Sequence, residues 1–302
     1  MQNPRKRKQP PKQLKPQSEP KSSKLTKEQQ EPYPTHLRPT PGDCRAIRDS
    51  LLAHHGFPPE FAKYRRGRPS LRPDDDDDKS INSLEKSVAS LDSEEVEESV
   101  LDGLVKMVLS QNTTEVNSLR AFSNLKSAFP SWEDVLAAEP KSVENSIRCG
   151  GLAPRKTSCI MNLLSCLQER KGKLCLEYLR NLSVDEVKAE LSLFKGIGPK
   201  TVACVLMFNL QHDDFPVDTH VFEIAKAIGW VPGEADRNKT YVHLNHRIPD
   251  ELKFDLNCLL YTHGKLCQRC TKKGSNHKKK ELNDGSCPLL TYCNFTVAAA
   301  DK

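Results

Sequence analysis

The sequence predicts an all-α fold arranged in two lobes. From Val100 onward, apolar residues recur at the i, i+3, i+4 and i+7 spacing that places them on one face of a helix. Proline, glycine or a capping residue separates most of these helical stretches. No run of β-branched residues alternates for long enough to predict a strand. The fold is therefore expected to be built from helices alone.

The expected helices begin before the main periodic region. A short helix is expected over 43–54, with Ile47, Leu51 and Leu52 on one face and Gly56 after its end. The clearest periodicity starts at Val100. Further helices are expected at about 115–128, 131–138, 140–147, 154–170, 174–180, 183–193, 199–210, 219–228, 233–244 and 249–263.

Two segments outside this region are polar. Residues 1–41 contain nine prolines among Lys, Gln and Ser, which predicts a disordered basic tail. Its tip, Pro4–Lys8, resembles a nuclear-import signal and predicts a nuclear location, with an ordinary solvated tail as the alternative. Residues 42–98 hold the first helix, a linker over 57–80 that ends in an acidic run, and a weak polar helix at 81–92.

Composition excludes several classes of protein. No run of about 18 apolar residues is present, so no membrane span is expected. The N-terminus has no apolar stretch of the kind found in a secretory signal. Eleven cysteines in such a chain indicate reduced thiols or metal ligands. The net charge of +6 permits a polyanionic partner without requiring one.

A glycine turn precedes the most apolar of the later helices. A polar helix ends near Leu193, Gly196-Ile197-Gly198 follows, and Pro199 occupies the favoured first position of the next helix. Both glycines can take positive φ and allow another backbone to come close. The free N–H groups at such a helix start could hold a DNA phosphate without reading a base. A plain helix–helix turn is the alternative, with Ile197 packed between the helices.

Two charged residues stand at helix starts. Lys200 lies in the first turn, where its charge opposes the helix dipole, and this unfavourable placement hints at a function. Asp218 precedes the helix expected at 219–228 and suits an N-cap. By themselves, a solvated lysine and a capping aspartate would explain both residues.

Together these segments resemble a known family. The Gly196–Thr201 turn followed by Val217–Val221 (Val-Asp-Thr-His-Val) resembles the helix-hairpin-helix (HhH-GPD) DNA glycosylases of the endonuclease III type, over residues of about 99–295. Leu109–Glu115 is similar to the family segment that places a polar wedge in the gap left by a flipped base. Asn112 stands where the family has glutamine, and Gln111 precedes it, so the identity of the wedge stays open.

The resemblance implies an architecture and a reaction. It implies a six-helix lobe over 99–215, and a second lobe that joins the first helix to 216–302, with the cleft between them. Lys200 would displace the base and form a Schiff base with the sugar, provided that burial and the helix dipole lower its pKa. β-Elimination would then nick the strand, while Asp218 would accept a proton or stabilise positive charge on the sugar.

The implied substrate is duplex DNA with an altered base, bound by a monomer. An oxidised pyrimidine is the default, with 5-methylcytosine or a mismatched base left open. Two alternatives stand beside this prediction. One is a glycosylase that uses water and does not nick, and the other is a helix-hairpin-helix DNA-binding protein without chemistry.

Four cysteines near the C-terminus predict a metal site. Cys267, Cys270, Cys287 and Cys293 could supply four thiolates to a [4Fe–4S] cluster or to tetrahedral zinc. The resemblance to endonuclease III implies the iron–sulfur cluster through the shared Cys-x5-Cys pair. Asp284 stands where the family has its second cysteine, so Cys270 is expected to replace it. Zinc and the absence of a metal stay open as alternatives.

Overall fold

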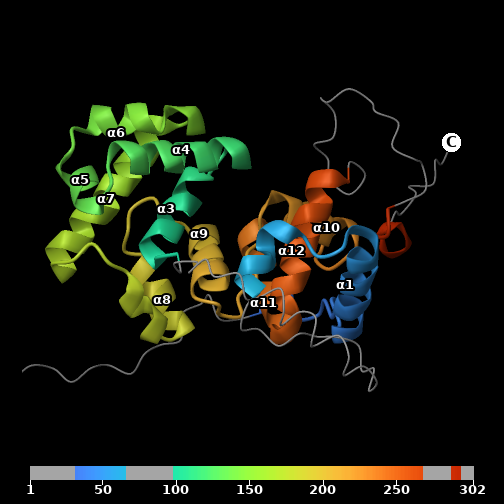
Figure 1. Cartoon of the computed structure of the whole chain (residues 1–302). Coiled ribbons are helices and arrows are strands. Elements are labelled where there is room, and N and C mark those ends of the chain that lie inside the picture. The colour runs from blue at the N-terminus through green and yellow to red at the C-terminus, as the bar shows by residue number, and fades with distance from the viewer. Residues whose placement is uncertain (1–30, 66–97, 268–286, 294–302) are drawn as a thin grey trace, which may run out of the picture. The chain divides into compact units, whose positions relative to one another are not determined.

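The computed structural model of the chain describes residues 31–65, 98–267 and 287–293. Every regular element within these ranges is a helix (Figure 1), so the predicted all-α class is confirmed. None of the described helices is long and apolar enough to cross a membrane. The basic tip of the tail, the expected helix at 81–92 and Cys270 lie outside the described ranges.

The elements follow one another with short connections through most of the chain. The α-helices are α1 (Pro41–His55), α3 (Val100–Leu109), α4 (Glu115–Ala128), α5 (Trp132–Ala137), α6 (Pro140–Ser146), α7 (Ala153–Lys171), α8 (Val184–Leu191), α9 (Pro199–Cys204), α10 (Thr219–Ala227), α11 (Arg237–Arg247) and α12 (Asp250–Leu266). The shorter elements are η2 (Pro59–Arg65), η3 (Arg148–Gly150), η4 (Glu177–Asn181), η6 (Leu290–Tyr292) and a π-helical turn, η5 (Val205–Asn209).

The first hydrophobic core is built by the helices from α3 to α9. Ser99 caps α3 by accepting a hydrogen bond from the Asp102 amide, and the apolar face of α3 is buried as its periodicity predicts. Ile197 of the glycine turn is 7% exposed and belongs to this core, which agrees with the expectation that it packs between helices. The turn is therefore anchored by its central side chain, while its backbone stays at the surface.

The second hydrophobic core joins α1 to α10, α11 and α12. Cys44, Ile47 and Leu51 of α1 are fully buried in it, and α1 packs along α12. The structure thus agrees with the predicted union of the first helix with the C-terminal region. This union brings the end of α1 close to the cysteines that follow α12.

The folded part begins earlier than the boundary predicted at residue 41. Arg247 Nε donates to Glu31 Oε1 at 2.6 Å, and the ring of His36 bonds to the Gly229 carbonyl at 3.1 Å. The ring of His243 bonds to the Arg38 carbonyl at 2.7 Å. Polar contacts made by an irregular segment leave no periodic signature, and so the sequence pattern did not distinguish this segment from the tail.

Two further differences concern η2 and the segment that follows α9. The predicted linker contains η2, whose Phe61 and Tyr64 rings lie 5.6 and 5.3 Å from the ring of Phe208. The helix expected at 199–210 changes to π-helical geometry at Val205, where the Leu210 amide bonds to the Val205 carbonyl at 3.0 Å. A local change of hydrogen-bond register has no signal in apolar spacing.

Candidate active site

The glycine turn connects α8 to α9, and its two glycines have different roles. Gly196 has φ +96°, and a Cβ there would lie 2.7 Å from the Cys159 sulfur on α7, so the fold itself requires glycine. Gly198 has φ −96°, and a Cβ there would meet nothing within 4 Å. Because the fold does not require glycine at this position, the free space leaves room for the backbone of an external partner.

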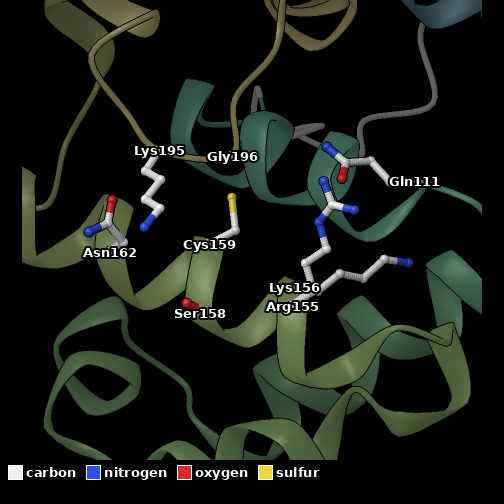
Figure 2. Close-up of a pocket in the computed structure, with 8 residues that line it drawn as sticks. All are labelled: Gln111, Arg155, Lys156, Ser158, Cys159, Asn162, Lys195 and Gly196. Atoms are coloured by element: carbon white, nitrogen blue, oxygen red, sulfur yellow. The ribbon is translucent and has the colours of Figure 1, made fainter.

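A pocket of about 400 Å³ lies beside this turn (Figure 2). Its lining residues are Gln111, Arg155, Lys156, Ser158, Cys159, Asn162, Lys195 and Gly196. Arg155 and Lys195 make no ion pair with any residue that the structure describes, so their charges are available to an anion. The sequence analysis predicted the turn but not these two cations beside it. Arg155 lies on α7, and Lys195 directly precedes Gly196.

Lys200 and Asp218 interact electrostatically across the two helices that carry them. Lys200 lies in the first turn of α9, and Asp218 caps α10 by accepting the Val221 amide at 2.8 Å. The pKa of Lys200 is raised, first by Cys204 one turn along α9 and then by the Asp218 carboxylate, while burial opposes both. The expectation that the pKa of Lys200 is lowered is therefore wrong.

Cys204 and Asp218 both raise the pKa of Lys200, and Cys204 has the larger effect. Burial raises the pKa of the Cys204 thiol, and the nearby Lys200 ammonium lowers it. A raised pKa keeps Lys200 as an ammonium, and this group must lose a proton before it can act as a nucleophile.

Tyr261 of α12 is a third group near this pair, and the sequence analysis did not predict it. Its ring lies 6.0 Å from the ring of His220 and 5.9 Å from that of Phe61, both edge to face. Burial raises the pKa of Tyr261, and the charges of Asp218 and Lys200 also act on it. An aromatic residue within an apolar helix is usually core, so no signal in the sequence could single out Tyr261.

The structure separates the two residues considered for the wedge. Gln111 is half-buried, and its Nε2 donates to Thr201 Oγ1 at 3.4 Å, which ties it to the start of α9. Asn112 is exposed and has φ +51°. Asn112 is therefore the more exposed of the two side chains, while Gln111 contacts the start of α9.

Lys156 holds the end of α3, just before Gln111 and Asn112, and the sequence analysis did not predict this role. It is 2% exposed, and its Nζ donates to the carbonyls of Leu109 at 2.7 Å and Gly150 at 2.9 Å. Burial lowers the pKa of Lys156. Because Leu109 is the last residue of α3, the ammonium holds the helix end from which Gln111 and Asn112 continue.

The C-terminal cysteines lie at the edge of the second core. Cys267, Cys287 and Cys293 all pack against it, while Cys270 is outside the described residues. Ligand atoms of His263, Cys267 and Cys287 lie within 4.8 Å of one another. Thiolate and imidazole groups suit zinc and iron, so the donors present fit a metal centre. His263 was not among the predicted ligands.

The chain is similar in sequence to known DNA repair proteins. The family model described as "HhH-GPD superfamily base excision DNA repair protein" matches residues 105–250. The chain is 63% identical over 277 residues to "Putative DNA glycosylase At3g47830" of Arabidopsis thaliana, covering 91% of this chain and 93% of that protein. It is 29% identical over 185 residues to "DNA glycosylase/AP lyase ROS1" of the same organism, covering 56% of this chain but only 13% of that protein.

Solved structures share the fold. Endonuclease III in a non-covalent complex with DNA matches 70% of this chain and 91% of its own, with a TM-score of 0.53 and 23% identity. The match of the family model lies over the segment that carries the glycine turn, Lys200 and Asp218. The similarity to the Arabidopsis relative extends beyond that segment, since it covers 91% of this chain. The chain therefore belongs to the HhH-GPD superfamily of base-excision DNA repair proteins.

Proposed function

We propose that the protein is a bifunctional DNA glycosylase, which removes an altered base from duplex DNA and then nicks the strand by β-elimination. The observation that carries this proposal is the electrostatic pairing of Lys200 and Asp218 beside an open glycine turn. Membership of a base-excision repair superfamily supports the reaction class, and the name of ROS1 includes AP lyase activity for that relative.

DNA binding is proposed at the turn and the adjoining pocket. The free space at Gly198 would admit a phosphodiester, and Arg155 and Lys195 would add attraction for neighbouring phosphates. Such contacts hold the backbone without reading the sequence. The exposed Asn112 would fill the gap left by the flipped base, and Gln111 would hold the wedge segment against α9.

The chemistry begins with proton transfer within the charged pair. Once a base is flipped into the cleft, the Lys200 ammonium gives a proton to the Asp218 carboxylate, and the neutral amine attacks C1′. The glycosidic bond breaks, and the base leaves with its electron pair and takes up a proton. Loss of the second amine proton and opening of the sugar ring give an imine. Removal of a C2′ proton then breaks the bond to the 3′ phosphate.

The substrate, location and metal belong to the same proposal. An oxidised pyrimidine is the base implied by the resemblance to endonuclease III, and the nucleus is the location implied by the basic tip and by the DNA substrate. The C-terminal cysteines would hold a metal centre with a structural role. A [4Fe–4S] cluster is the form that the resemblance implies, and a single zinc ion is the alternative.

The test is a panel of duplexes, each with one altered base, scored for base release, strand cleavage and covalent trapping. Borohydride reduces an imine to a stable amine, so it should link enzyme and DNA during turnover. Lys200→Gln should lose trapping and nicking but keep DNA binding, whereas Lys195→Gln, the matched control, should trap normally.

Three other results would each reject part of the proposal. Base release without nicking in Lys200→Gln would mean that water is the nucleophile. Trapping that persists in that variant would mean that another amine forms the imine. Binding without base release from any duplex, with the wild-type chain, would favour a DNA-binding protein without chemistry.

A further inference from the structure

Tyr261 lies near Lys200 and Asp218 with a hydroxyl group that has no partner in the described chain. It is half-buried on α12, and the charges of Lys200 and Asp218 both act on it. Its hydroxyl forms no hydrogen bond with any residue of the described ranges, yet the oxygen is open to solvent. A phenol both donates and accepts hydrogen bonds, so this group is available to a substrate.

The ring of Tyr261 is held by contacts on several sides. Phe61 of η2 and His220 of α10 meet it edge to face, with 5.9 and 6.0 Å between ring centres. Nζ of Lys265 lies 5.1 Å from the ring centre, and it also pairs with Glu115 Oε2 at 3.1 Å. These contacts fix the ring, and with it the position of the hydroxyl oxygen.

Gly264 allows α12 to approach the start of α10 closely. A Cβ at Gly264 would lie 2.5 Å from Cβ of His220, so a larger residue there would push the two helices apart. His220 follows Asp218 by two residues, in the first turn of α10. The close packing therefore places Tyr261, about one turn before Gly264, next to the helix start that carries Asp218.

The proposed reaction creates a charge that neither Lys200 nor Asp218 stabilises. When the glycosidic bond breaks, its electron pair stays on the base, and negative charge develops on the base ring. In a pyrimidine, the carbonyl oxygen O2 adjoins the glycosidic nitrogen and carries part of that charge. A hydrogen-bond donor that is already fixed in place stabilises such a charge without reorganisation.

On the basis of the proposed glycosylase function, we propose that Tyr261 is a further catalytic residue, whose hydroxyl donates a hydrogen bond to O2 of the departing pyrimidine. The hydrogen bond stabilises the negative charge while the bond to C1′ breaks, and water supplies the proton that the free base takes up. This contact favours pyrimidines, because an unmodified purine has no oxygen beside its glycosidic nitrogen.

Tyr261→Phe tests the hydroxyl, because it keeps the ring and its neighbours. Single-turnover release of the pyrimidine that the wild type removes fastest should slow by roughly 10²- to 10³-fold, as when one donor to a developing negative charge is lost. On DNA with a preformed abasic site, nicking and borohydride trapping should keep the wild-type rate, because the base has already left. Thermal unfolding should not change.

Tyr178→Phe is the matched control. The Tyr178 hydroxyl donates to Glu190 at 2.8 Å, and its ring packs against the first core. Loss of this hydroxyl should lower the thermal midpoint slightly and leave the rate of base release unchanged.

A modified substrate tests which atom accepts the hydrogen bond. In the 2-thio analogue of the same pyrimidine, sulfur replaces O2 and accepts hydrogen bonds only weakly. The ratio of the wild-type rate to the Tyr261→Phe rate should therefore fall toward one with this analogue. This comparison separates the contact from the effect of sulfur on the leaving group, because that effect is common to both proteins.

Any of four results would overturn the proposal. Unchanged base release in Tyr261→Phe would show that the hydroxyl takes no part, and an equal loss of activity on abasic-site DNA would show a structural role. An unchanged rate ratio with the 2-thio analogue would mean that O2 is not the acceptor. Release of purines but of no pyrimidine would exclude the substrate class. Absence of base release by the wild type from every duplex would instead reject the proposed glycosylase function itself.

Discussion

Replacing Asp218 by asparagine separates the two roles that the structure gives to this carboxylate. Asp218 caps α10 through Oδ1, which accepts the Val221 amide at 2.8 Å, and it also raises the pKa of Lys200. Asparagine keeps the accepting oxygen and ranks with aspartate as an N-cap, so the free energy of unfolding should change little. Alanine loses the cap and should lower the free energy of unfolding by about 1 kcal/mol.

The catalytic cost of Asp218→Asn should be much larger than its structural cost. Loss of a positioned proton acceptor slows a reaction by about 10²- to 10⁴-fold. This range corresponds to roughly 2.7–5.4 kcal/mol of lost transition-state stabilisation, at 1.36 kcal/mol for each factor of ten. The pKa of Lys200 should fall, because the variant removes a negative charge that raises it. The rise of the trapping rate with pH should therefore move to lower pH.

The assay is base release in single-turnover experiments, measured from pH 6 to 10 alongside thermal unfolding. Asp236→Asn is the matched control, because Asp236 caps α11 in the same way, through Oδ1 and the Lys239 amide at 2.9 Å. The control should keep both activity and stability. Full activity in Asp218→Asn, or a thermal midpoint reduced as far as in Asp218→Ala, would refute the assignment of a catalytic role beyond the cap.

Three other predictions concern the surroundings of the site. Lys156→Met should lower the free energy of unfolding by about 1–3 kcal/mol for each carbonyl that loses its donor, and it should also weaken DNA binding. The control Lys173→Met, at an exposed position, should do neither, and equal melting curves for the two variants would contradict the role of Lys156. In calorimetry, a chain that starts at Glu31 should unfold at the same temperature as the full chain. A chain that starts at Pro41 should unfold at a lower temperature, because it loses the contacts of Glu31 and Arg38 with α11. Gly198→Asp should fold normally, because a Cβ at this position has free space. In filter-binding assays the variant should bind every DNA sequence more weakly by the same factor. A loss of binding confined to damaged DNA would mean that the turn reads the base.

The sequence by itself determined most of the secondary structure and the central pair of residues. Apolar spacing identified the start of α3 at Val100 and a helix over 115–128, which is α4, because a helix with one buried face must repeat every three to four residues. The sequence pattern around the site spans only a short stretch of the chain. It consists of the Gly-x-Gly turn, the lysine two residues after it and the aspartate that follows, so it can be recognised from the sequence. Local rules of capping and glycine conformation also act within a few residues, and so they leave a trace in the sequence.

The tertiary structure decided which distant side chains meet. Three contacts join residues of different helices: Lys156 with the end of α3, Tyr261 with Asp218, and His55 with His263. Apolar periodicity shows that a face is buried, but not which partner buries it, so these contacts left no pattern to read. The pKa of Lys200 was predicted in the wrong direction because the prediction considered only burial and the helix dipole, whereas Cys204, one turn along the same helix, and Asp218, from another helix, both raise this pKa.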